Sequence, residues 1–418
     1  MPQFPYYTEP THDQGAVATA GRDTAIQSAE SRLVVDAVDK IFLLEPNKHP
    51  LVTLMTNVGK VYDGKSWHGS SIMKAPASNF EFDWFEDYYG GRYAKVSGTY
   101  SGSGGVTITV VGAGSSSAYI FTVGDIFMNA RTGERMLVAT IGSATTITVA
   151  AGGRAFGSTA AAGGVDGDEL YIVGNASEEN SGARNINTTR SAKQYNYTQI
   201  FKKTIGTSGT AAETNTYGGP DMKYQRAKVG TEHALDIERA FWFGERKTTT
   251  GTNGHPLRAT GGIHEFITTG GSYVQNQGGA LTAPDLNSFL REGFTYGNDE
   301  KMLFAGGIVL QAITEISRGQ LQTKVGDSTY GVAIQQWITP FGKINIVHNP
   351  LFTGSLAGSA YLLDMESFRY RYINNRDTKL MTNVQAPDVD GEIDQYLTEC
   401  GLERKQAPRN ALLKGVTV

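Results

Sequence analysis

A stretch of low charge, from about residue 97 to 177, interrupts the chain and limits what it can fold into. The stretch is rich in glycine, serine, alanine and threonine. Turn signals separate its short β-prone runs, which lie at 106–111, 118–123, 135–141, 145–151 and 169–173. Short strands at this spacing, without helical periodicity, are typical of a small β-barrel or sandwich. We therefore expect an all-β domain over 97–177.

The segments on either side of this domain alternate in the manner of strands. FEFDWFEDYY (80–89) places apolar and acidic side chains on opposite faces, and QYNYTQIFKKTI (194–205) also alternates. We predict a long two-stranded excursion, formed by 80–95 and 194–205, with the β domain inserted within it. An isolated two-stranded ribbon is marginally stable in water, so the excursion needs a neighbour.

The strongest helical pattern covers residues 221–247. Val229, His233, Ile237 and Phe241 lie four apart and predict one buried face, while charged residues cover the other side. A helix of this length would span about 40 Å, whereas a typical helix has about 11–12 residues. We expect it to support flanking sheets, with His233 as a structural histidine.

The remaining elements frame these parts. Residues 1–25 are expected to form an extended arm, and 28–44 an amphipathic helix that packs on its own domain or on a neighbouring chain. After the long helix, the pattern predicts a mixed α/β region and a closing strand pair. Its elements are a helix opened by a capping box at Thr282–Asp285, a strand at 301–305, a helix from 308 to Gly319, a hairpin of 331–338 and 343–349, and strands at 360–364 and 368–373.

Composition excludes several classes of protein. The formal net charge of −4 provides no basic excess for gripping phosphates. Cys400 is the single cysteine, so no internal disulfide forms and assembly in a reducing cytoplasm is compatible with the sequence. No apolar run reaches membrane-spanning length, and the N-terminus lacks the basic start and apolar stretch of a signal peptide. We expect no membrane partner.

The sequence lacks the catalytic motifs that would indicate an enzyme. It contains no G-x-S-x-G elbow, P-loop, H-E-x-x-H or cysteine pair. We predict that the chain is not an enzyme and uses no cofactor. Asp388, Asp390 and Asp394 resemble the start of a Ca²⁺ loop, but the closing glutamate and flanking helix are missing. An acidic turn entering a strand is therefore favoured over a metal site.

The order of these parts resembles the Hong Kong 97-type fold of tailed-bacteriophage major capsid proteins. The stretches 80–89, 195–211, 228–246 and 394–416 resemble a podophage-related group with an insertion domain in the extended loop. The resemblance implies an α+β fold. Its implied parts are an N-terminal arm and helix (1–45), the first half of the extended loop with peripheral region (46–96), an inserted β-barrel or β-sandwich domain (97–177), the second half of the extended loop (178–219), the spine helix and peripheral domain (220–260), the axial domain (261–390) and closing peripheral strands (391–418).

The resemblance also implies a function and partners. Copies would assemble in the bacterial cytoplasm, as hexamers and pentamers, into an icosahedral virion shell around double-stranded DNA, without sequence-specific DNA contact. Portal and scaffolding proteins, and a decoration protein, are the further partners that it implies. Aromatic and apolar side chains would make the inter-subunit contacts: Trp84, Phe85, Tyr88, Tyr89, Tyr195, Tyr197, Phe201, Leu33 and Ile41.

Three alternatives stay open from the sequence. The first is an encapsulin-like nanocompartment shell, against which the insertion counts. The second is another virion part, such as a tail or baseplate protein. The third is a secreted carbohydrate-active enzyme, which the missing signal peptide and the missing acid/base pair disfavour.

Overall fold

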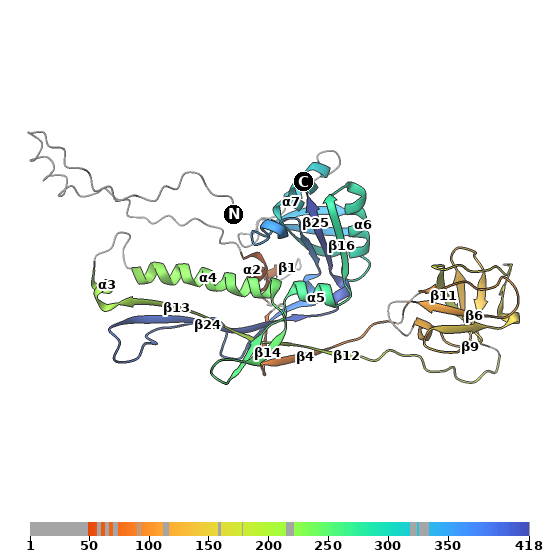
Figure 1. The fold of residues 1–418 in the computed structure, drawn as a ribbon, viewed down its shortest axis with the longest axis horizontal. Coiled ribbons are helices and arrows are strands. Elements are labelled where there is room, and N and C mark those ends of the chain that lie inside the picture. The colour runs from red at the N-terminus through yellow and green to blue at the C-terminus, as the bar shows by residue number, and fades with distance from the viewer. Residues whose placement is uncertain are drawn as a thin grey trace, which may run out of the picture. The chain divides into compact units, whose positions relative to one another are not determined.

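The computed structural model describes residues 49–417 except 57–59, 63–66, 70–73, 90, 92, 112–116, 158–159, 178, 215–220, 318–323 and 326–333 (Figure 1). The described residues divide into two compact units. The smaller contains 202–233 and 380–396, and the larger contains the rest. Helix α4 (Asp221–Phe243) and strands β13 (Gln199–Ser208) and β24 (Gly391–Arg404) run from one unit into the other. The predicted arm and helix of residues 1–45 lie outside the described residues.

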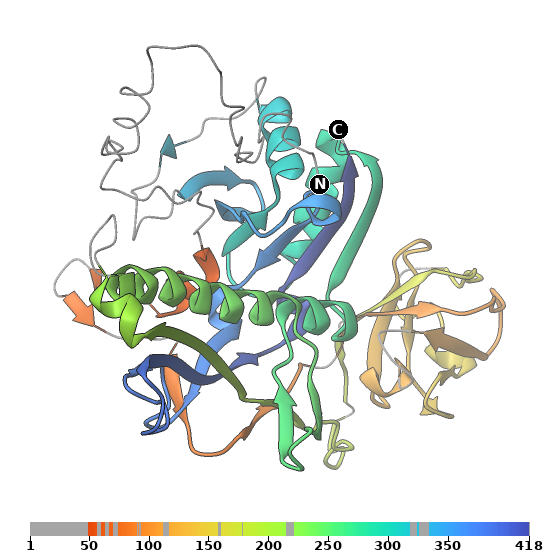
Figure 2. The same cartoon turned by 60° about the vertical axis from the view of Figure 1, so that its left-hand side comes forward.

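A seven-stranded mixed sheet forms the centre of the larger unit (Figure 1, Figure 2). Its strands, in spatial order, are β16 (Tyr273–Ala280), β25 (Ala411–Thr417), β21 (Ala360–Leu363), β17 (Glu300–Ala305), β20 (Gly342–His348), β19 (Ile334–Thr339) and β18 (Lys324–Val325). Helices α6 (Ala283–Gly293) and α7 (Gly307–Ser317) pack on one face, in a cluster that includes Phe289 and Ile313. Helices α2 (Pro50–Thr56), α5 (Ile263–Thr269) and the C-terminal half of α4 pack on the other, around Trp242.

Successive side chains of the central strands enter these two clusters in turn. In β21, Ala360 and Leu362 belong to the cluster under α6 and α7, while Tyr361 and Leu363 belong to the cluster under α4. A strand covered on both faces must be apolar on both, which explains the continuous apolar run. The predicted capping box of α6 is confirmed, since Thr282 and Asp285 bond reciprocally, and the predicted hairpin is confirmed by the antiparallel pairing of β19 with β20.

A second sheet contains β13, β24, β22 (Phe368–Ile373) and β3 (Lys74–Ala77) in that order, with β23 (Lys379–Met381) also paired to β24. The predicted closing strand pair is therefore wrong. β24 belongs to this sheet, whereas β25 lies between β16 and β21 in the seven-stranded sheet. A left-handed residue, Gln406, and a short 3-10 turn at Ala407–Arg409 separate the two strands. Because Ala411, Leu412 and Leu413 are all buried, β25 suits a central position.

Helix α4 confirms three members of the predicted row, because His233, Ile237 and Phe241 are buried, whereas Val229 is half-buried. The helix ends at Phe243, four residues before the predicted end at residue 247. Gly244 follows it, and a β-carbon there would lie 2.5 Å from the carbonyl oxygens of Ala240 and Thr260. Only glycine, which has no β-carbon, fits at this close approach of the backbone to the Ala240 and Thr260 carbonyls, where the helix ends.

Residues 93–175 form a sheet of their own, with a separate core (Figure 1, Figure 2). Its order is β8 (Arg135–Leu137), β7 (Asp125–Asn129), β11 (Glu169–Asn175), β5 (Tyr93–Val96), β6 (Val106–Val111), β10 (Thr146–Val149) and β9 (Thr140–Ile141). The chain passes directly from β8, which pairs with β7, to β9, which pairs with β10. Between them, Val138 donates to the Asp125 carbonyl of β7 and Ala139 to the Thr148 carbonyl of β10. The sheet therefore closes into a barrel, and we call residues 93–175 the barrel.

Two details of the barrel differ from the sequence-based expectation. The run 118–123 is not a strand, because Ser117–Ile120 forms a 3-10 turn that places Ala118 and Phe121 in the core. Strand β5 lies in the barrel sheet, whereas the sequence interpretation placed residues 93–96 in the extended loop. The proposed boundary at residue 97 therefore falls one strand inside the sheet.

Smaller elements complete the described chain. They are two strand pairs, β1 (Lys60–Tyr62) with β2 (Trp67–Gly69) and β14 (Lys247–Thr250) with β15 (Pro256–Ala259), the helix α3 (Gly209–Glu213), and the 3-10 turns at Ala151–Gly153, Gly354–Leu356 and Met365–Ser367. The described chain combines α-helices with many strands, which confirms the α+β class. The two-stranded excursion, the long helix and the α/β region follow in the predicted order of the Hong Kong 97-type fold.

Candidate assembly interface

Strands β4 (Glu81–Glu86) and β12 (Ala192–Tyr197) pair with each other and with no other described strand, and we call this pair the ribbon. The predicted second long strand is divided at Thr198, whose amide donates to the Phe80 carbonyl at 2.8 Å. Before this break Asn196 is buried, and after it Phe201 is buried. The inward side of the strand thus changes from even to odd positions, as at an irregularity in a ladder.

The inner face of the ribbon is covered by the chain itself. Phe82 and Trp84 are buried and stack with their ring centroids 6.2 Å apart. The Trp84 indole donates to the Glu86 carboxylate at 2.8 Å, and the backbone amide of Gln406 donates to the same oxygen at 2.8 Å. These bonds join the end of β4 to the segment that follows β24.

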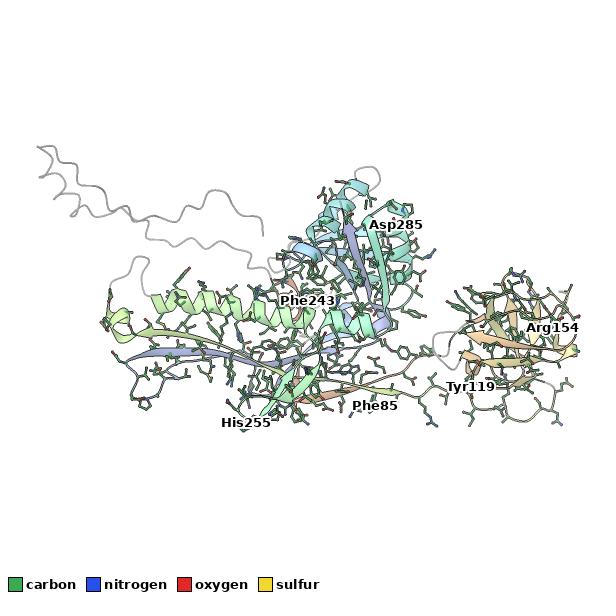
Figure 3. The ribbon with its side chains drawn as sticks, in the orientation of Figure 1. Phe85, Tyr119, Arg154, Phe243, His255 and Asp285 are labelled. Atoms are coloured by element: carbon green, nitrogen blue, oxygen red, sulfur yellow. The ribbon has the colours of Figure 1, made fainter. Side chains whose placement is uncertain are left out.

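Exposed aromatic side chains lie on the outer face of the ribbon, at Phe85, and in the segment that follows β4. Phe85 is 71% exposed and points away from the ribbon (Figure 3), and beyond the strand end Tyr89 is fully exposed and Tyr88 about half exposed. The Tyr88 hydroxyl donates to Glu86 at 3.1 Å, and burial, followed by the charge of Glu86, raises the pKa of Tyr88 to about 12. Asp83 pairs with Lys193 at 2.7 Å on the same face. This surface therefore carries uncharged aromatic side chains and an ion pair whose two charges cancel.

Asn196 anchors the base of the ribbon. Its amide nitrogen donates to the carbonyls of Leu402 and Gly261, and its amide oxygen accepts from the Gly261 amide at 2.9 Å. One fully buried side chain thus joins three distant segments. Sequence reasoning missed it because a polar residue in an alternating strand reads as an outward position.

The predicted contact residues divide into four groups. Phe85, Tyr88 and Tyr89 are exposed. Trp84 and Phe201 are buried inside the chain, so they are not available to a second copy, and their inclusion is corrected. Tyr195 and Tyr197 are half-buried, because the Arg246 guanidinium covers the Tyr195 ring at 4.1 Å. Leu33 and Ile41 lie outside the described residues.

The hairpin of β14 and β15 was not singled out from the sequence. Every residue of β14 is exposed, and Leu257 on β15 is 60% exposed. The Arg258 guanidinium lies 3.7 Å from the Phe80 ring centroid, which places the hairpin beside the start of the ribbon. Its threonine run, Thr248–Thr250, is a strand signal that could have been recognised.

The candidate Ca²⁺ loop is contradicted by the structure. Asp394 is buried on β24 and pairs with Arg226 at 2.5 Å, while Asp388 and Asp390 are exposed in the preceding turn. The Asp394 carboxylate is therefore already engaged by a cationic side chain, which disfavours a cation at this position. In the part of the chain that the structure describes, no cluster of three or more His, Cys, Asp or Glu side chains could hold a metal ion.

Comparison with protein families gives one match over almost the whole chain. Residues 17–417 match the model of the SU10 major capsid protein family. This chain belongs to the SU10 major capsid protein family. The family is one of structural capsid proteins. The matched residues include the ribbon, the barrel and the two other large sheets.

A curated relative agrees with membership of the SU10 family. The chain is 24% identical over 275 residues to the major capsid protein of Pseudomonas phage PaMx41. The match covers 62% of this chain and 64% of the relative, which is less than two thirds of the relative's length.

Solved structures that resemble this SU10-family chain include a phage capsid and an encapsulin complex. They include the capsid of Myoviridae phage XM1, at TM-score 0.40 and 10% identity, covering 58% of this chain and 81% of that one. They also include the SrpI encapsulin complex of Synechococcus elongatus, at TM-score 0.39 and 11% identity, covering 55% and 77%. Among the helices described here, none is long and apolar enough to cross a membrane.

Proposed function

We propose that the chain is the shell subunit of a tailed bacteriophage. Copies assemble as hexamers and pentamers into an icosahedral virion capsid that encloses double-stranded DNA without sequence-specific contact. Membership of a major capsid protein family supports this function over a tail or baseplate part. The net charge of −4 suits a wall that contains DNA without gripping it.

The observation that carries the proposal is the exposed aromatic face of the ribbon. Two strands with one exposed aromatic face are marginal in water, and large rings of this kind dominate protein interfaces. Phe85, Tyr88 and Tyr89 are therefore proposed to pack on a neighbouring copy, as the extended loop of this fold would. The inserted domain and the N-terminal arm, which were proposed from the sequence, would be parts of each subunit in such a shell.

The remaining partners are proposed on the same basis. Assembly takes place in the host cytoplasm, where the single buried thiol, Cys400, remains reduced. Portal and scaffolding proteins act in assembly, and a decoration protein binds the finished shell. The chain catalyses no reaction and uses no cofactor in this role.

Electron microscopy of the expressed full-length protein tests the proposal. The unchanged chain is expected to form closed shells; tubes or fibres, or a protein that stays monomeric at every concentration, would contradict it. The double variant Phe85→Ser/Tyr89→Ser is expected to stay folded and to lose assembly. Tyr119→Ser, which changes an exposed tyrosine of the barrel (Figure 3), is the matched control and should assemble normally.

A further inference from the structure

The first helix of the described chain, α2, is held at its start by a residue of α4. An α-helix begins with amides that lack helical partners. Pro50 has no amide hydrogen to satisfy, and Leu51 and Val52 donate to the two carboxylate oxygens of Glu238 at 3.0 and 2.6 Å. Thr53 then donates to the His49 carbonyl and begins the helical pattern. One distant carboxylate therefore satisfies the orphan amides of α2.

The Glu238 carboxylate is buried without a counter-charge. Its side chain has no exposed surface, and its third partner is the Trp242 indole, which donates at 3.0 Å. The influences on its charge are burial and these three hydrogen bonds, with no cation of the described chain among them. Burial of an unpaired carboxylate favours the neutral form, while the three donors favour the ionised one.

The other titratable groups around this contact can be named by element. Tyr361 on β21, Tyr370 on β22 and Cys400 on β24 lie in the same core cluster. Burial raises the pKa of each of them, so all three remain neutral near pH 7. They therefore supply no charge change where a carboxylate in this setting titrates.

The elements that make the contact carry further groups. His49 precedes α2, and His233 lies on α4, where its ring stacks on Tyr396. Asp236 and Arg239, also on α4, pair with each other at 3.1 Å on the outer side of the helix. α2 itself contains no ionisable side chain.

We propose that Glu238 is a proton-linked latch that seats α2. When α2 is seated, the carboxylate is buried; when α2 lifts, water reaches it. The seated state therefore binds a proton more tightly than the open state. Seating is strongest at low pH and weakens as the pH rises.

The pH range of the latch follows from the environment of the carboxylate. Burial, opposed by the hydrogen bonds from Val52, Trp242 and Leu51, raises the pKa of Glu238 from 4.5 to about 7. Seating is then fully favoured below about pH 4.5, is lost progressively as the pH rises, and is weakest above about pH 7. The latch thus responds just below neutral pH, whether or not copies assemble.

Hydrogen exchange of the full-length chain, followed by mass spectrometry, tests the latch. Protection of the peptide that covers α2, corrected for intrinsic exchange, is expected to fall by up to about tenfold per pH unit between pH 5 and 7. Glu238→Gln should show no such slope. The peptide of α6, whose cap is the exposed Thr282–Asp285 pair, is the internal control and should stay flat.

A second variant keeps the test decisive if Glu238→Gln does not fold. Trp242→Phe removes one donor to the carboxylate, so its loss of protection should move to higher pH. Protection of α2 that is flat or rises with pH in the unchanged protein would overturn the proposal. The proposal would also be overturned if protection of α2 fell with pH in Glu238→Gln as steeply as in the unchanged protein. The same holds if the loss of protection in Trp242→Phe occurred at the same pH as in the unchanged protein.

Discussion

The barrel and the ribbon are neighbours in sequence, but they differ in how far contacts within the chain cover their strands. The barrel closes its sheet on itself and fills it with a core of its own that includes Phe121, Phe127 and Ile147. The ribbon has two strands, one covered face, and aromatic rings exposed on the other. A closed sheet has no edge to offer, whereas an open ribbon presents unpaired backbone and side chains. The barrel is complete within one chain, whereas the open face of the ribbon is the surface proposed to contact a neighbouring copy.

A buried ion pair shows how far the barrel depends on internal contacts. Arg154, which is labelled in Figure 3, and Glu134 are almost fully buried, and two hydrogen bonds of 2.7 and 3.0 Å join them. Arg154 also donates to the carbonyls of Ser101, Gly104 and Ala162. Burial alone would raise the pKa of Glu134, but the bonds from Arg154 and from two backbone amides lower it. Three loops at one end of the barrel are thus fixed by one pair.

The largest expected effect is on the barrel. Arg154→Leu leaves the Glu134 carboxylate buried and unpaired, which costs about 3–5 kcal/mol. We expect the barrel to unfold at markedly lower denaturant concentration, measured by chemical denaturation. Lys95→Leu removes an exposed ion pair with Glu169 in the same barrel and should change stability by less than about 1 kcal/mol. Equal effects of the two changes would show that the barrel does not depend on its internal pair.

A smaller effect is expected at the base of the ribbon. Asn196→Ala leaves the buried Gly261 amide and the Leu402 carbonyl without their partner, at a cost of about 1–3 kcal/mol. Thermal unfolding of the soluble chain measures it. Asn187→Ala removes bonds from an exposed asparagine, to Tyr119 and Thr122, and should be nearly neutral. A neutral Asn196→Ala would mean that the base is fixed by other contacts.

The smallest effect on stability is expected from the largest change to the chain, the removal of the barrel. Replacing residues 93–175 with a short Gly-Ser link should leave the free energy of unfolding of the rest within about 0.5 kcal/mol, because the barrel shares no core cluster with it. The link is feasible because β5 and β11 are paired neighbours, with Tyr93 opposite Tyr171. An insoluble product would contradict the independence of the barrel.

Local patterns were readable from the sequence. The α4 row from His233 to Phe241, the Thr282 capping box and the alternation of β4 each depend on residues close in the chain, and each is confirmed. The alternation of 194–205 failed at Thr198, since the break that exchanges the faces depends on a bond to Phe80. The strand pairing of the C-terminus was wrong because both segments read as strands, and pairing is decided by distant partners.

The long-range polar contacts of Asn196 and Glu238 could not be predicted from the sequence. Asn196 contacts residues 65 and 206 positions away, and Glu238 caps a helix 187 positions away. Nothing in the local sequence separates such residues from exposed polar ones. For the interface, composition identified the aromatic segment, but only burial separated Phe85 from Trp84.

The adjacency of β5 and β11 has a mechanical consequence. The chain enters the barrel along one of these strands and leaves along the other, and the two run antiparallel side by side. Tension on the flanking segments would pull the strands apart at one end, breaking their hydrogen bonds in succession as a zipper opens. Such geometry yields at lower force than shear along the strands. A subunit stretched through these two segments is therefore expected to open first at the pairing of β5 with β11.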